Sequence, residues 1–202
     1  MSTTLISHPS ASETTDSRVN ILGLGRKDIA RELAKIGIPD NKLKMRSSQI
    51  FQWLYHHGVQ DFSAMTNIAK TLQGELAQHF SLERPEIIER QVSVDGTRKY
   101  LVRMAPGIEV ESVFIPDVSK TGALCVSSQV GCTLTCKFCH TGTQRLVRNL
   151  TAREIILQII VARDDLGEWP TQQENRKLTN ICLLYTSPSP RDATLSRMPS
   201  SA

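Results

Sequence analysis

Apolar residues recur with two different periods along this chain, and the period changes near Pro85. Before Pro85 they are spaced three or four residues apart, which predicts three helices at about 26–36, 46–57 and 68–80. These helices are expected to form a small unit whose core contains Ile29, Leu33, Ile36, Ile50, Trp53, Leu54, Ile68, Leu72, Leu76 and Phe80.

Local signals mark the ends of these helices. Gly37 and Gly58 are typical of helix C-termini, and Asn67 is a favoured N-cap for the third helix. His56 and His57 stand at the end of the second helix, where the partial negative charge favours a cation, so we expect a capping role for them.

After Pro85 apolar and polar residues alternate, as they do in strands. Two strands at about 87–94 and 98–104 are joined by Asp95-Gly96, which is a strong hairpin signal. Further strands are expected at about 109–115 and 123–127.

A helix and one more strand follow a loop that is rich in cysteine. Thr151 and Glu154 form a capping box that begins a helix ending near Gly167, and a strand begins near Leu178. A strand, a loop, a helix and a second strand make one βα unit of a parallel sheet, and active-site loops lie at the carboxyl ends of such strands. The predicted fold class is α/β, with a small helical domain and a β-hairpin followed by part of a (β/α) barrel.

The chain divides into four segments on this basis. Residues 1–20 are polar and lack periodicity, which predicts a disordered leader. Residues 21–84 form the helical domain, and residues 85–184 form the first part of the barrel with the cysteine loop. Residues 185–202 are rich in Ser and Pro and are expected to be disordered.

Composition adds few constraints. The 202 residues carry a formal net charge of +4, which permits a nucleic-acid partner without demonstrating one. We find neither a signal peptide nor an apolar run long enough to span a bilayer, so we expect a cytoplasmic protein with no membrane partner. The five cysteines are expected to stay reduced in that compartment.

Cys132, Cys136 and Cys139 fall within eight residues, in the spacing Cys-x3-Cys-x2-Cys. A structural zinc ion requires four ligands in a closed site. Three thiolates on a four-iron cluster instead leave one iron open for a chelating cofactor. The local count of three ligands therefore favours an iron-sulfur cluster with an open iron.

Other chemistries remain open for this loop. His140 could complete a zinc site, although adjacent residues rarely reach the same tetrahedral centre, and the chain would then be a zinc- and RNA-binding module without catalysis. A disulfide is disfavoured in an intracellular chain. A thiol redox function is disfavoured because no isolated Cys-x2-Cys pair opens a redox helix.

A basic cluster of Lys42, Lys44 and Arg46 lies between the first two predicted helices, close to Gln49 and Gln52. We interpret it as a solvated loop and helix start, because short basic clusters are frequent. A phosphate-contacting patch is the alternative.

The cysteine spacing, with Phe138 just before the last cysteine, resembles the signature of the radical S-adenosylmethionine enzymes. The flanking motifs narrow this resemblance. The stretches Glu111–Pro116, Leu124–Cys132 and Arg148–Leu150 resemble, in this order, the radical S-adenosylmethionine rRNA adenine-C2 methyltransferases.

The resemblance extends beyond the loop. The helical segment Phe51–Tyr55 and the hairpin around Asp95-Gly96-Thr97 are similar to the N-terminal part of that family, so that the similarity runs from about Leu22 to Ile181. Residues 21–84 would then form an RNA-binding accessory domain.

The resemblance implies a methyltransferase that modifies carbon 2 of an adenine in 23S rRNA and in some tRNAs. The family uses a [4Fe-4S] cluster and S-adenosylmethionine, and an electron from the cluster breaks the sulfonium bond to give a 5′-deoxyadenosyl radical. One cofactor molecule methylates a cysteine, and a second supplies the radical that abstracts hydrogen from that methyl group. The family also implies a monomer and an electron donor such as a flavodoxin.

Residue by residue, Cys132, Cys136 and Cys139 match the cluster ligands, which also bring the cofactor to the open iron. Cys125 matches the cysteine that helps resolve the protein–RNA adduct and can pair with the methyl-carrying cysteine. From its residue type alone, Cys125 is a small buried hydrophobe.

Glu111 matches the catalytic proton acceptor of the family. Strand alternation places Glu111 on one face with Val113 and Ile115, so together with the resemblance we expect a partly apolar site that favours a general base. From the residues alone, the alternative is an edge-strand glutamate that points at water. Three basic residues around the loop, Arg145, Arg148 and Lys137, are either solvated or in contact with RNA phosphates or the cofactor carboxylate.

The sequence departs from the family after Ile181. The family continues there with a Gly-Met-Gly-Glu-Pro type cofactor motif, whereas this chain continues from Cys182 into a Ser/Pro-rich tail that resembles translated adapter or vector sequence. The methyl-carrying cysteine lies near the C-terminus of the family and has no counterpart here, and we interpret Cys182 as an ordinary strand residue. Because a complete barrel needs about 250 residues, we expect a C-terminally truncated, inactive chain.

Overall fold

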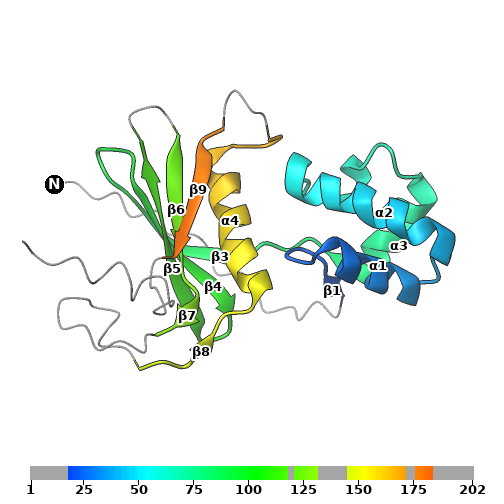
Figure 1. Ribbon diagram of the computed structural model, residues 1–202, viewed down its shortest axis with the longest axis horizontal. Coiled ribbons are helices and arrows are strands. Elements are labelled where there is room, and N and C mark those ends of the chain that lie inside the picture. Colours follow the sequence, from blue (N-terminus) through cyan, green and yellow to red (C-terminus); the bar gives the residue numbers. More distant parts are fainter. Residues whose placement is uncertain (1–17, 118–120, 132–144, 172–175, 184–202) are drawn as a thin grey trace, which may run out of the picture.

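The computed structural model describes residues 18–117, 121–131, 145–171 and 176–183. They form a helical lobe and a sheet lobe (Figure 1), and the long helix α4 (Ala152–Leu166) lies between the sheet and the helical lobe. The mixed α/β fold expected from the sequence is confirmed.

The helical lobe is built from residues 18–82. Its elements are β1 (Val19–Asn20), α1 (Arg26–Lys35), α2 (Asp40–Gln52), the π-helix η1 (Trp53–His57), the 3-10 helix η2 (Phe62–Ala64), α3 (Lys70–His79) and β2 (Phe80–Ser81). Strands β1 and β2 pair in parallel and bring the two ends of the lobe together.

The core of this lobe contains most of the apolar residues expected from helical periodicity. Buried side chains include Ile29, Leu33, Ile50, Leu54 and Leu76, each at most 1% exposed. Leu157 and Ile160 of α4 belong to the same cluster. The core of the helical lobe is therefore completed by a helix that also covers the sheet.

Three boundaries differ from the sequence prediction. Helix α2 begins at Asp40 rather than near Arg46, because Pro39 takes the N-cap position and Asp40 lies in the first turn, where an acidic side chain is favourable. The basic cluster at 42–46 is therefore helical and not a loop. Asn67 does not cap α3, whose N-cap is Ala69. The Oδ1 atom of Asn67 instead accepts a 2.6 Å hydrogen bond from Trp53 Nε1.

The third difference concerns the expected leader at 1–20. Val19–Asn20 already form a strand of the helical lobe, and Leu22 N donates a 2.9 Å hydrogen bond to Asn20 Oδ1. Residues 1–17 and the expected tail at 185–202 lie outside the described residues.

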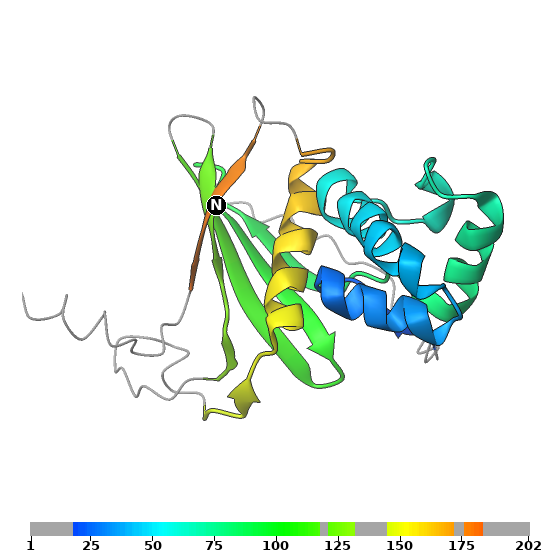
Figure 2. The same cartoon turned by 45° about the vertical axis from the view of Figure 1, so that its right-hand side comes forward.

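The sheet lobe holds five strands in the order β3-β4-β5-β6-β9. They are β3 (Glu86–Val92), β4 (Arg98–Ala105), β5 (Ile108–Pro116), β6 (Gly122–Val126) and β9 (Leu178–Leu183). Neighbours pair antiparallel from β3 to β6, whereas β6 and β9 pair in parallel. Figure 2 shows α4 along one face of this sheet, and the helical lobe lies on the side of α4 that faces away from the sheet.

The predicted βα unit is present. Strand β6, the cysteine loop, α4 and the parallel strand β9 follow one another, and α4 begins with the expected capping box of Thr151 and Glu154. Gly167 ends the helix with a φ of 64°, in the left-handed region that glycine adopts readily. The loop therefore leaves the sheet at the carboxyl end of β6.

Two short strands close the base of the cysteine loop, β7 (Gln129–Val130) and β8 (Arg148–Asn149). Within the described part of the chain, no helix is long and apolar enough to cross a membrane.

Candidate active site

The predicted cluster ligands Cys132, Cys136 and Cys139 lie outside the described residues, as do His140 and Lys137. The structure does describe both ends of their loop, up to Gly131 on one side and from Arg145 on the other. We refer to residues 127–131 and 145–150 as the loop neck.

Backbone pairing joins the two sides of the loop neck. Val147 N donates a 2.8 Å hydrogen bond to Val130 O, and Leu150 N donates one of 2.8 Å to Ser128 O. The loop therefore starts and finishes at a fixed two-stranded base.

Gly131 is the last described residue before the cysteines, and its φ of 75° lies in the left-handed region. A Cβ built on Gly131 would lie 2.2 Å from Arg145 O, far closer than any real contact. Both the conformation and the close approach of the opposite side of the neck require glycine here.

A buried glutamine attaches the neck to α4. Gln158 is 0% exposed, and its side chain accepts a 2.9 Å hydrogen bond from Ser127 N and donates one of 3.0 Å to Ser127 O. These two bonds satisfy the backbone of the residue at which the chain leaves β6. Ser127 Oγ also donates a 2.6 Å hydrogen bond to Glu111 O on β5.

An ion pair attaches the other side of the neck to the same helix. Arg148 Nη1 and Nη2 donate hydrogen bonds of 2.9 and 2.7 Å to Glu154 Oε2 and Oε1. Glu154 also accepts a hydrogen bond from Thr151 N as part of the capping box. The hydrogen bonds from Arg148, and then those from Thr151, lower the pKa of Glu154 to about 2 despite partial burial.

This contact changes the interpretation of the basic residues near the loop. Arg148 is occupied by Glu154, which indicates a role in holding the neck. Arg145 is exposed at the neck.

Glu111 lies on the sheet face that α4 does not cover. Residues opposite one another in a sheet share a face, and Glu111 is paired with Leu101, while Val113 is paired with Cys125. The alternate residues Val110 and Phe114 are buried in the cluster that contains α4. Glu111 and Cys125 thus share the face that forms the interior when such a sheet closes into a barrel.

The surroundings of Glu111 differ from the partly apolar site expected from the sequence. The side chain of Glu111 is 34% exposed, and its Oε1 forms an ion pair with Lys99 Nζ at 2.6 Å. The neighbouring strand β4 supplies this cation, because Lys99 lies on the uncovered face of β4, diagonally across from Glu111. The expectation that Val113 and Ile115 share this face holds, but Ile115 is itself 48% exposed.

Cys125 and Cys182 are register partners on β6 and β9, with Cα atoms 4.6 Å apart, and their sulfur atoms form a disulfide. Cys182 is a strand residue, as predicted, but it is also bonded to the cysteine for which the sequence suggested a chemical role. The expectation that all five cysteines stay reduced is therefore wrong for this pair, whose positions on adjacent strands bring the two sulfur atoms together.

Several residues of the site were not identified from the sequence. Ser127 lies within the stretch Leu124–Cys132, but no role was assigned to it. Gln158 belongs to no motif, although a glutamine inside the apolar run 155–161 is a signal of a buried polar contact. Lys99 could have been found by pairing the predicted strands 98–104 and 109–115, because it then lies diagonally opposite Glu111 on the same face of the sheet.

The fold and the loop position define the class of this protein. A crystal structure of a radical SAM methyltransferase from Sphaerobacter thermophilus matches it with a TM-score of 0.65 and 35% sequence identity, over 81% of this chain and 45% of that chain. The helical lobe narrows the class, because residues 19–82 match the family model of the ribosomal RNA large subunit methyltransferase N-terminal domain.

Named relatives complete the comparison. The dual-specificity RNA methyltransferase RlmN of Phenylobacterium zucineum (strain HLK1) is 59% identical over 169 residues, which are 83% of this chain and 44% of that protein. The RlmN of Caulobacter vibrioides (strain NA1000 / CB15N) is 57% identical over 175 residues, which are 86% of this chain and 43% of that protein. The chain belongs to the RlmN family over the part that it spans, which is less than half the length of these relatives. The family resemblance inferred from the sequence is confirmed.

Proposed function

We propose that these residues belong to a radical S-adenosylmethionine methyltransferase acting on carbon 2 of an adenine in 23S rRNA and in some tRNAs. The observation that carries the proposal is the loop neck, a two-stranded base that follows the carboxyl end of a parallel strand and immediately precedes Cys-x3-Cys-x2-Cys in the sequence. Relatives named dual-specificity RNA methyltransferases support the substrate.

In this proposal Cys132, Cys136 and Cys139 hold a [4Fe-4S] cluster, which supplies reductive cleavage of S-adenosylmethionine when both are bound. The electron would come from a donor such as a flavodoxin, and the enzyme would work as a cytoplasmic monomer through a methylcysteine-derived radical.

The described residues have two roles in the same scheme. Glu111 accepts the proton from the adenine adduct, and Lys99 keeps its carboxylate in place on the uncovered sheet face. Cys125 would help to resolve the protein–RNA adduct by pairing with the methyl-carrying cysteine of the family. In this structure Cys125 is bonded to Cys182 instead, so that bond has to be reduced before Cys125 can act.

We also propose that the 202 residues by themselves form no 2-methyladenosine, because the segment after Ile181 does not match the cofactor motif of the family. Mass spectrometry of nucleosides from RNA incubated with the reconstituted chain, S-adenosylmethionine and a reductant tests this. Formation of 2-methyladenosine would contradict it.

The cluster is tested separately from catalysis. After anaerobic reconstitution we expect about four irons per chain, and Cys136→Ala should lose most of this iron because only two thiolates remain. Cys125→Ala is the matched control and should retain the iron. Zinc without iron would instead support the alternative of a zinc- and RNA-binding module, and unchanged iron in Cys136→Ala would refute the ligand assignment.

A further inference from the structure

A pocket of about 680 Å³ opens on the helical lobe, well away in sequence from the cysteine loop. One wall is Arg26, the first residue of α1, and the remaining lining residues are Ser48, Phe51, Gln52, Tyr55 and His56. These five follow the three- and four-residue spacing of one helix face on α2 and η1. None of the six lining residues carries a carboxylate.

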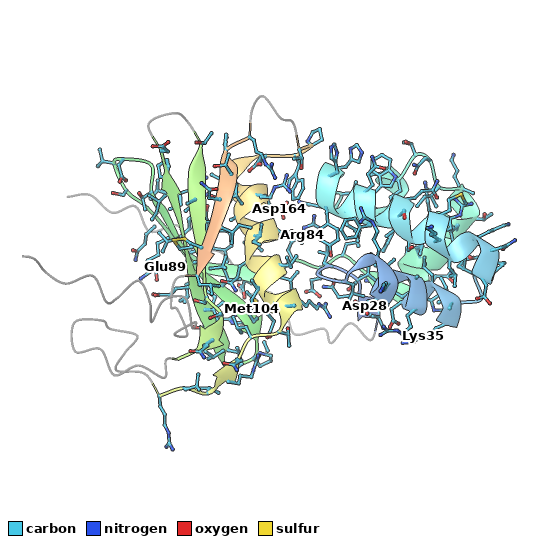
Figure 3. The ribbon with its side chains drawn as sticks, viewed as in Figure 1. Asp28, Lys35, Arg84, Glu89, Met104 and Asp164 are labelled. Carbon is cyan, nitrogen blue, oxygen red and sulfur yellow. A yellow bond between two sulfur atoms is a disulfide. The ribbon has the colours of Figure 1, made fainter. Side chains whose placement is uncertain are left out.

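Arg26 is held in the pocket by an aromatic ring and not by an acid. Its guanidinium carbon lies 4.1 Å from the centroid of the Phe51 ring. The nearby Arg31 pairs with Asp28, which Figure 3 labels in the first turn of α1, whereas no carboxylate within the described chain forms an ion pair with Arg26. Stacking on Phe51 leaves the planar N–H donors of Arg26 for a ligand.

Phe51 and Tyr55 form the aromatic floor of the pocket, and a hydrogen bond of Tyr55 attaches this floor to the segment before α1. Phe51 and Tyr55 rings lie 4.4 Å apart, and Tyr55 Oη donates a 2.9 Å hydrogen bond to Leu24 O in the segment before α1. Burial raises the pKa of Tyr55 to about 12, so the hydroxyl remains a protonated donor at neutral pH. The same bond joins Tyr55 to the segment that leads into Arg26, two residues after Leu24.

The helix changes its winding at this point. Residues Trp53–His57 form a π-helix, a feature found often at functional sites. Its carbonyls accept hydrogen bonds from α4 and from the segment after α4. Arg163 Nη1 on α4 donates one of 3.3 Å to Tyr55 O, and Thr171 N donates one of 2.8 Å to His56 O. The floor of the pocket is thus tied to the helix that carries the loop neck.

We propose that this pocket binds one unpaired nucleotide of the RNA substrate. A phosphate would meet the donors of Arg26, and a base would stack on the exposed part of the Phe51 and Tyr55 rings. Ser48 and Gln52 offer a hydroxyl and an amide for the edge of the base. Recognition of unstacked bases by aromatic and guanidinium planes is the usual way in which proteins read single-stranded RNA. The inference rests on the proposed RNA substrate and assigns a place for it on the helical lobe.

The test is fluorescence anisotropy of the 202-residue chain with a short fluorescein-labelled single-stranded RNA. Arg26→Gln should weaken binding roughly tenfold and lower the slope of log affinity against log salt by about one. Arg31→Gln is the control, because it removes the same charge from the same helix outside the pocket and should change affinity less than about twofold. Equal losses in the two variants would overturn the proposal, since they would indicate diffuse charge attraction only.

Two further readings keep the test independent of the catalytic proposal. A duplex of the same sequence should bind without any difference between wild type and Arg26→Gln, because its bases are stacked; an equal loss on duplex would refute the nucleotide pocket. Photocrosslinking with 5-iodouridine should label the peptide that contains Phe51 and Tyr55, and a crosslink found only elsewhere would refute it too. Failure of iron binding in the cysteine loop leaves each of these outcomes unaffected.

Discussion

Gln158 shows how a single buried polar side chain can hold the loop neck in place. It replaces water at both backbone groups of Ser127, where β6 ends and the neck begins, and it lies in an otherwise apolar part of α4. Periodicity predicts the apolar neighbours of Gln158 correctly, but it treats a glutamine at that position as an interruption. The contact joins residues 31 apart, which local patterns do not reveal.

Gln158→Leu roughly keeps the size of the side chain and removes both of its hydrogen bonds with Ser127. We expect it to lower the free energy of unfolding by about 2–3 kcal/mol, because the N–H and C=O of Ser127 would remain buried without partners. Urea unfolding measures this. Gln78→Leu, an exposed glutamine on α3, should change the free energy by less than about 0.5 kcal/mol, and a Gln158→Leu as stable as wild type would rule out the role assigned here.

At the scale of elements, the sequence predicts best where the determining residues are local. Thr151 and Glu154 gave the start of α4, Asp95-Gly96 gave the hairpin, and both are present. The start of α2 was misplaced because its N-cap is Pro39, which has no capping side chain. Glu111 was placed on the correct face of β5, but its ion pair with Lys99 depends on the register of β4 against β5.

Glu154, in the capping box of α4, makes the stability of the protein depend on pH. Its pKa of about 2 in the folded state lies below the ordinary value of 4.5, so its contribution is fully present above about pH 4.5 and is lost as the pH falls toward 2. We expect Glu154→Gln to be less stable than wild type by about 1 kcal/mol at pH 6, because glutamine can keep the capping box but loses the charged pair with Arg148.

The difference between Glu154→Gln and wild type should shrink between pH 4.5 and pH 3. Chemical denaturation of both proteins across this range provides the measurement. Subtracting the two curves removes the contribution of other acids, including Asp165, whose pKa is lowered by its hydrogen bonds from Arg98 and Arg90 against the effect of burial. A difference that stays constant down to pH 3 would show that the carboxylate charge is not involved.

At the scale of the whole molecule, the two lobes are joined by a polar contact that no local pattern predicts. Arg84 lies where the helical lobe passes into β3, and Asp164 lies on α4, 80 residues later; both are labelled in Figure 3. Arg84 Nε donates a 3.0 Å hydrogen bond to Asp164 Oδ2, and Arg84 Nη2 donates to the carbonyls of Gly58 and Val59. Trp169 Nε1 donates a 2.6 Å hydrogen bond to the other oxygen of Asp164.

Arg84 is 14% exposed and Asp164 19%, so removing the cation leaves a largely buried carboxylate with one remaining partner. We expect Arg84→Met to cost about 3 kcal/mol and to uncouple the lobes, so that unfolding followed by tryptophan fluorescence precedes unfolding followed by far-UV circular dichroism. Trp169 reports on the contact between the lobes, which is why fluorescence should change first. Arg31→Met, which breaks an exposed pair on α1, should keep the two transitions coincident. Coincident transitions in Arg84→Met would mean that the shared apolar core, through Leu157 and Ile160, is enough to hold the helical lobe against the sheet.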